Sequence, residues 1–147
     1  MRNAGRAVAA TLITILGLTA CDGAGSDSVS GTISMPPALQ KTLGASDTLF
    51  ITARPAGQVG GPPLAVLKEV GMKFPLAYTI GQEDVMIPGR FFTGKVEVQA
   101  LIRKSGIVTV PVPGDMRGAV GKPVDAGSKG VDFVMDQADA AASAAAK

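Results

Sequence analysis

The chain of 147 residues contains no histidine and no tryptophan, and it has a single cysteine and a single tyrosine. Without histidine, it cannot form a Ser–His–Asp or Cys–His catalytic arrangement, a histidine-bearing zinc site, a type-1 copper site or a histidine-ligated haem. A single cysteine also leaves the folded chain without an internal disulfide. We therefore predict a non-catalytic protein with no metal ion and no cofactor.

A basic region beyond the N-terminus is also missing. Arg2 and Arg6 account for the formal net charge of +2, because basic and acidic residues are equal in number over the rest of the chain. A nucleic-acid-binding protein normally carries a basic patch or stripe. We therefore expect no nucleic-acid partner.

Residues 1–21 have the parts of a bacterial secretion signal. Arg2 and Arg6 precede an uncharged, largely apolar run over residues 7–20. This run is shorter than the ~20 residues that a helix needs to span a bilayer, so it fits a signal peptide better than a membrane helix. Its end, Leu-Thr-Ala before Cys21, resembles a lipobox, in which the cysteine thiol is acylated before the signal is removed. We predict a signal peptide over residues 1–20 and lipidation of Cys21; the alternative is an ordinary secretion signal with a chance cysteine.

Lipidation of Cys21 predicts how the mature chain is held. Burial of acyl chains contributes ~0.8 kcal/mol per methylene, so several chains anchor a protein stably. We expect the anchor on the periplasmic side of a bacterial membrane, and Asp22 favours the inner membrane because it resembles a retention signal of enterobacterial lipoproteins. Residues 21–28 are the anchored cysteine and a small, polar tether. Residues 138–147 are rich in alanine, lack an apolar face and are predicted to be a disordered tail.

Between the tether and the tail, residues 29–137 contain short β-forming runs separated by glycine and proline turn signals. The expected strands are residues 29–35, 48–54, 64–69, 76–80, 95–103, 107–112 and 131–135. No amphipathic helix is evident, so a parallel sheet with crossover helices is excluded. The spacing is typical of an antiparallel β-sandwich or barrel.

Two short patterns resemble chemical sites only weakly. Residues 118–122 (GAVGK) are not a phosphate loop, because Met116 stands where that motif needs its first glycine and Pro123 follows the lysine. Glu83 and Asp84 are adjacent carboxylates in a polar loop, where we expect them to be solvated.

The remaining candidates for chemistry are basic and thioether side chains. Arg103, Lys104 and Arg117 could bind an acidic partner, but isolated charges at strand ends are normally solubility features. The methionines after the signal peptide are scattered along the chain, so we expect them to fill the core.

A series of motifs from Phe50 onward occurs in a characteristic order. The motifs are FITAR (residues 50–54), GPPLAVLK (61–68), VEVQALIRKSG (96–106) and PGDMRG (113–118). In this order they resemble the immunoglobulin-like C-terminal domain of CcmI/CycH-type cytochrome c biogenesis proteins, over residues 29–137. The resemblance implies an Ig-like, antiparallel β-sandwich of about seven strands. It also implies an accessory role in c-type cytochrome maturation, where apocytochrome is delivered to a haem ligase.

The chain also departs from the family pattern. Family members usually carry membrane-spanning helices and helical repeats ahead of this domain, and here the predicted lipid anchor takes their place. The family-motif residues are Arg54, Pro62, Pro63, Arg103 and Asp115, for which we expect structural roles at turns and strand ends. We predict a membrane-anchored protein-interaction module whose partners are cytochrome maturation proteins or apocytochrome. The alternative is a generic structural or adaptor lipoprotein of the envelope without a cytochrome role.

Overall fold

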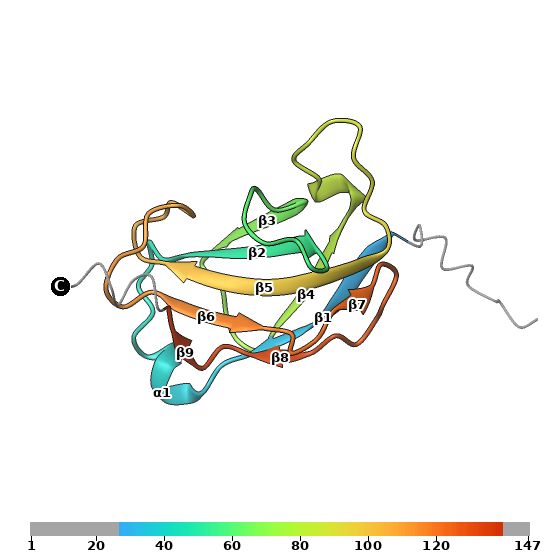
Figure 1. Ribbon diagram of the computed structural model, residues 1–147. Coiled ribbons are helices and arrows are strands. Elements are labelled where there is room, and N and C mark those ends of the chain that lie inside the picture. The colour runs from blue at the N-terminus through green and yellow to red at the C-terminus, as the bar shows by residue number, and fades with distance from the viewer. Residues whose placement is uncertain (1–26, 140–147) are drawn as a thin grey trace, which may run out of the picture.

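The computed structural model describes residues 27–139, which form two β-sheets packed on a common apolar core (Figure 1). The all-β, Ig-like sandwich expected from the sequence is confirmed. The predicted signal peptide and Cys21 lie outside the described residues. Within residues 27–139, no helix has the length and apolar character needed to cross a bilayer.

The smaller sheet has the strand order β4-β1-β8, and the larger has the order β3-β2-β5-β6-β9, with β7 paired to β5. The strands are β1 (Ser28–Ser34), β2 (Thr48–Pro55), β3 (Ala65–Val70), β4 (Leu76–Gly81), β5 (Lys95–Arg103), β6 (Met116–Ala119), β7 (Val124–Asp125), β8 (Phe133–Val134) and β9 (Gln137–Ala138). The described helices are one four-residue α-helix, α1 (Pro37–Gln40), and one 3-10 turn, η1 (Gln82–Asp84).

Strand β5 shows how the sequence pattern produces the sandwich. Val96, Val98, Ala100 and Ile102 alternate along it and are buried between the two sheets. Because successive side chains of a strand point to opposite faces, the residues between them lie on the outer face of the larger sheet. The strands expected at residues 29–35, 48–54, 64–69, 76–80 and 95–103 are confirmed within one residue at each end.

The strand expected at residues 107–112 is wrong, because turns occupy this segment. Pro111 has no backbone N–H to donate to a sheet. The Ser105 hydroxyl donates to the carbonyl oxygen of Val110 at 2.7 Å, and the backbone N–H of Val112 donates to a carboxylate oxygen of Asp115 at 2.9 Å. Local side-chain hydrogen bonds therefore replace the ladder that the β-branched residues suggested.

The chain from residue 114 onward also differs from expectation. The glycine-rich connection contains β6 and β7, and only Phe133 and Val134 of the expected last strand are in β8. Strand β8 pairs with β1 in parallel, which is an exception to the antiparallel arrangement predicted for the whole sandwich.

The end of the domain lies beyond the predicted boundary at residue 137. Ala138 is part of β9, which pairs with β6, and Asp139 is buried. The prediction of a disordered tail is therefore wrong for these two residues. Residues 140–147 lie outside the described part of the chain.

Tyr78 of β4 contacts the opposite edge of the smaller sheet, at and just before β8, inside the core. Its hydroxyl donates to the carbonyl oxygen of Val131 at 2.8 Å, and its ring packs edge-to-face on Phe133 with 5.8 Å between the ring centroids. Burial, and secondarily the negative charge of Asp132, raise the pKa of the Tyr78 hydroxyl well above its ordinary value near 10.

The raised pKa predicts how stability changes in alkali. Above pH ~10 the unfolded chain loses the Tyr78 proton while the folded protein retains it, so the folded state binds more protons and stability falls as the pH rises. Tyr78 is the single tyrosine, so phenolate absorbance reports on it alone. We expect the phenolate band of the native protein to appear at a higher pH than that of the denatured chain. Coincident titration curves would contradict a buried hydroxyl.

Candidate functional site: a groove on the outer face of the larger sheet

A buried ion cluster anchors one border of the candidate site. The guanidinium group of Arg103, at the end of β5, lies 3.1 Å from a carboxylate oxygen of Asp115 and also pairs with Asp139. The Arg103 side chain is 8% exposed and that of Asp115 is fully buried. The expectation that Arg103 is a solubility feature is therefore wrong, because a solvated charge would not be enclosed by two carboxylates.

Asp115 also organises the turns at residues 104–115. Its carboxylate accepts hydrogen bonds from the backbone N–H groups of Lys104 (2.8 Å) and Val112 (2.9 Å). The Lys104 ammonium pairs with Asp47 at 2.6 Å. Arg103 and Lys104, at this end of the sheet, therefore both form ion pairs inside the domain.

Arg54 holds the loop on the opposite border. Its guanidinium donates to the carbonyl oxygens of Gly61 (2.6 Å) and Gly60 (3.3 Å). The next two residues, Pro62 and Pro63, line a groove together with Arg54 and Arg103. The structure therefore brings four of the family-motif residues to one groove, and Asp115 supports it through Arg103.

The groove lies on the outer face of the larger sheet and has a volume of about 840 Å³. Its lining surface is mainly apolar, and its size falls in the usual range for ligand sites, about 300–1,000 Å³. Phe50 and Thr52 of β2 and Gln99 and Leu101 of β5 form the floor. The walls come from the loop at residues 61–63 with Met86 on one side, and from Val108 and Thr109 on the other.

The floor contains a buried hydroxyl group with no hydrogen-bond partner. Thr52 is 2% exposed, and its Oγ1 atom has no donor or acceptor within reach among the described residues. Thr52 lies opposite Gln99 of β5 and Val66 of β3 in the sheet register, on the face that lines the groove. A buried hydroxyl usually finds a partner, so an orphaned one in a groove marks a position where a ligand atom could bind.

Basic side chains surround the apolar floor. In one cross-strand row of the sheet, Lys68 of β3, Phe50 of β2, Leu101 of β5 and Arg117 of β6 are neighbours. The Lys68 ammonium lies 5.9 Å from the centroid of the Phe50 ring. None of the salt bridges formed within residues 27–139 involves Lys68, Arg117 or Arg54. The groove therefore combines an apolar floor with a cationic rim.

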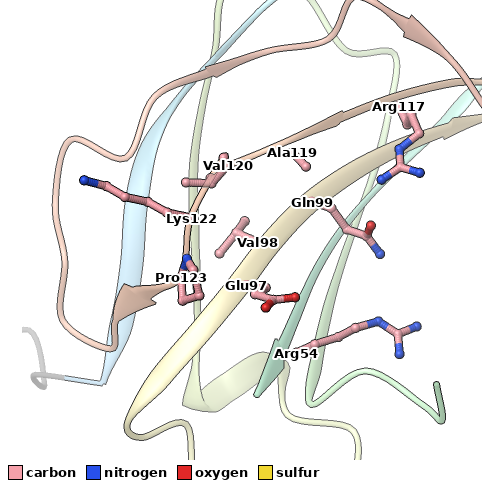
Figure 2. Close-up of a pocket in the computed structure, with 10 residues that line it drawn as sticks. Arg54, Glu97, Val98, Gln99, Arg117, Ala119, Val120, Lys122 and Pro123 are labelled. Atoms are coloured by element: carbon pink, nitrogen blue, oxygen red, sulfur yellow. The ribbon is translucent and has the colours of Figure 1, made fainter. Parts of the chain in front are cut away.

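A second, more polar hollow adjoins the groove (Figure 2). It shares Arg54, Gln99 and Arg117 with the groove, and Figure 2 shows these three side chains extending to the same side of the sheet. Lys122 points in a different direction from them. Lys122 of the GAVGK segment is thus not grouped with Arg54 and Arg117, the cations that an anionic ligand in this hollow would contact.

The other residues examined in the sequence have local roles. Asp84 accepts a hydrogen bond from the backbone N–H of Gly81 at 2.9 Å and so caps η1. Met35, Met116 and Met135 are buried in the core, whereas Met86 is 60% exposed at the groove wall. Among residues 27–139, no cluster of three acidic or thiol side chains could hold a metal ion. The chemistry that the groove offers is therefore that of apolar and cationic side chains.

The sequence of β2 contains a signal for this groove. All residues of β2 from Thr48 to Ala53 are buried, although one face of this strand points away from the core. A continuous apolar run is typical of a strand covered on both faces. In this protein, Phe50 and Thr52 on the outer face of the strand are buried and line the groove.

Two packed sheets around a common core define an Ig-like β-sandwich domain. The family described as the cytochrome c-type biogenesis protein H Ig-like domain matches residues 29–136. The chain therefore belongs to this family, as its motif order suggested.

None of the curated proteins matches the chain. Among solved structures, an alternative pilotin from the type II secretion system of Vibrio cholerae is similar, with a TM-score of 0.48 and 12% sequence identity, covering 76% of this chain and 96% of that chain.

Proposed function

We propose that this protein is a non-catalytic binding module of c-type cytochrome assembly, anchored by lipid to the periplasmic side of a bacterial membrane. The observation that carries the proposal is the family match over residues 29–136, which includes nearly all of the described fold. The groove supports a role in binding, because its apolar floor, and the cations Lys68 and Arg117 that form no salt bridge within residues 27–139, offer contacts to another molecule. The partner in this role is a cytochrome maturation protein or apocytochrome, and the module binds protein rather than haem.

The anchoring part of the proposal depends on Cys21. Cys21→Ala, combined with replacement of residues 1–20 by a secretion signal that is cleaved without lipidation, removes both the thiol that would carry the acyl chains and the apolar signal segment. We therefore expect this variant to move from the membrane fraction to the soluble periplasmic fraction. Immunoblots of fractionated cells measure this shift, and labelling with a radioactive fatty acid measures the modification directly. Equal membrane retention of the variant and the native protein would contradict lipid anchoring.

A deletion strain tests the cytochrome role. We expect loss of the gene to reduce haem-stained c-type cytochromes in membranes, and the native chain to restore them. The transcript of an apocytochrome is measured in parallel, so that a failure of assembly is distinguished from a failure of expression. Unchanged haem staining would remove the cytochrome role and leave the generic adaptor of the envelope as the function.

A further inference from the structure

The buried Thr52 hydroxyl is the feature of the groove that the fold itself does not use. The side chains of Asp47, Arg103 and Asp115 are partnered within the domain, whereas Thr52 Oγ1 has no partner among the described residues. Burial without a partner destabilises the domain, and a valine would fill the same space without that cost. Any hydrogen-bond partner for this hydroxyl would therefore have to come from outside residues 27–139, on the side of the groove that Thr52 lines.

The cations around the floor indicate the charge of that molecule. Arg117 and Lys68 lie at opposite ends of the row that contains Phe50 and Leu101, and neither is in a salt bridge within residues 27–139. Adjacent strands are about 4.8 Å apart, so four strands place the backbone positions of the two cations about 14 Å apart. A ligand that fits between them has an apolar centre and anionic groups on both sides.

We infer that the groove binds a short peptide segment of a partner protein in which apolar side chains alternate or cluster with acidic ones. The apolar side chains cover Phe50 and Leu101, and the carboxylates pair with Lys68 and Arg117. A polar group of the peptide, from its backbone or a side chain, completes the hydrogen bonding of Thr52. This inference deepens the proposed function and rests on it, because it states the chemistry of the segment through which the assembly partner is recognised.

The position of the hydroxyl favours a peptide over a membrane surface. Thr52 is 2% exposed at the bottom of the groove, between the Pro62–Pro63 loop and residues 108–109. A flat layer of lipid headgroups would contact Lys68 and Arg117 but would not reach this depth. A peptide side chain can enter the groove and cover the floor residues Phe50 and Leu101, which a flat layer of headgroups would not reach.

Peptide binding to the complete mature chain tests the inference. The probe is a fluorescein-labelled synthetic peptide in which leucine and phenylalanine alternate with glutamate, and fluorescence anisotropy measures its Kd. We expect matched peptides with glutamine or lysine in place of glutamate to bind at least about tenfold more weakly, and binding to weaken with added salt.

Matched variants locate the binding site. Lys68→Glu combined with Arg117→Glu should weaken binding about tenfold or more. Lys73→Glu combined with Arg90→Glu changes the total charge equally at exposed positions outside the groove, and we expect it to bind almost as tightly as the native chain. Thr52→Val should weaken binding several-fold while its melting temperature is unchanged or higher, which a purely structural role for the hydroxyl would not produce.

Four outcomes would overturn the inference. Equal binding of the glutamate and glutamine peptides would show that carboxylates are not recognised. Binding to phosphatidylglycerol vesicles that depends on Lys68 and Arg117, without peptide binding, would assign the groove to the membrane. Binding of haemin with the same dependence, and without peptide binding, would assign it to a porphyrin. Peptide binding by a chain that ends at Asp139, but not by the complete chain, would assign it to residues 140–147.

The peptide assay and the deletion strain test different claims, so a negative result in one does not decide the other. Loss of cytochromes in the deletion strain, together with no peptide binding, would preserve the assembly role and remove the groove assignment. Peptide binding with normal cytochromes would preserve the groove as a peptide site and remove the cytochrome role.

Discussion

Replacement of Asp115 by alanine should lower the free energy of unfolding by about 3–5 kcal/mol, as measured by urea denaturation of the purified domain. The substitution removes a fully buried carboxylate that accepts hydrogen bonds from Arg103 and from the backbone of Lys104 and Val112. It leaves the Arg103 guanidinium buried with Asp139 as its remaining acidic partner. A small domain without a disulfide has a total stability of about 5–15 kcal/mol, so the loss is a large part of the whole.

Asp125→Ala is the matched control for this prediction. Asp125 pairs with Lys95 at 3.2 Å, but both side chains are more than half exposed, at 71% and 63%. Because solvent screens such a pair, its removal should change the free energy of unfolding by less than about 1 kcal/mol. Similar urea midpoints for Asp115→Ala and the native protein would mean that the ion cluster does not hold the turns at residues 104–115.

Sequence patterns predicted those parts of the fold in which the local preference of each residue for strand or turn agrees with its burial in the folded domain. Strand β5 is an example, because its buried valines and its ends at Lys95 and Arg103 follow from alternation and flanking turns alone. Residues 107–112 have an equally strong β-branched pattern, but the Ser105 hydroxyl donates to the carbonyl oxygen of Val110 and the Asp115 carboxylate accepts from the backbone N–H of Val112. Such side-chain competition has no periodic signal in a sequence.

The candidate site was less predictable than the fold because the residues that form it are far apart in the sequence. The partner of Arg103 at residue 139 is 36 residues away, inside the segment whose alanine-rich composition indicates a tail. The family resemblance identified Arg54, Pro62, Pro63, Arg103 and Asp115 as motif residues, but not that the first four line a common groove. Thr52 had no sequence signal at all, since its importance lies in a hydrogen bond that the fold does not make.

Replacement of Gly31 by alanine should destabilise the domain by about 3 kcal/mol, because it would force β1, the central strand of the smaller sheet, away from residues 128–131. A Cβ atom at Gly31 would overlap the carbonyl group and backbone nitrogen of Val131. This segment cannot move away freely, since Ser30 exchanges backbone hydrogen bonds with Ser128 (3.0 Å) and Val131 (2.9 Å) on either side of the contact. The carbonyl oxygen of Val131 also accepts a hydrogen bond from the Tyr78 hydroxyl, so a displacement of Val131 would disturb the core around Tyr78.

The same substitution at Gly121 provides the control, because a Cβ atom there meets nothing within 4 Å and the backbone lies outside the left-handed region. We expect Gly121→Ala to change the free energy of unfolding by less than about 0.5 kcal/mol. Thermal and urea unfolding of both variants measure the difference. If Gly31→Ala were as stable as Gly121→Ala, the close approach of β1 to residues 128–131 would not be what requires glycine at this position. In that case, β1 and residues 128–131 could lie further apart than they do in this structure, where Ser30 forms backbone hydrogen bonds with Ser128 and Val131.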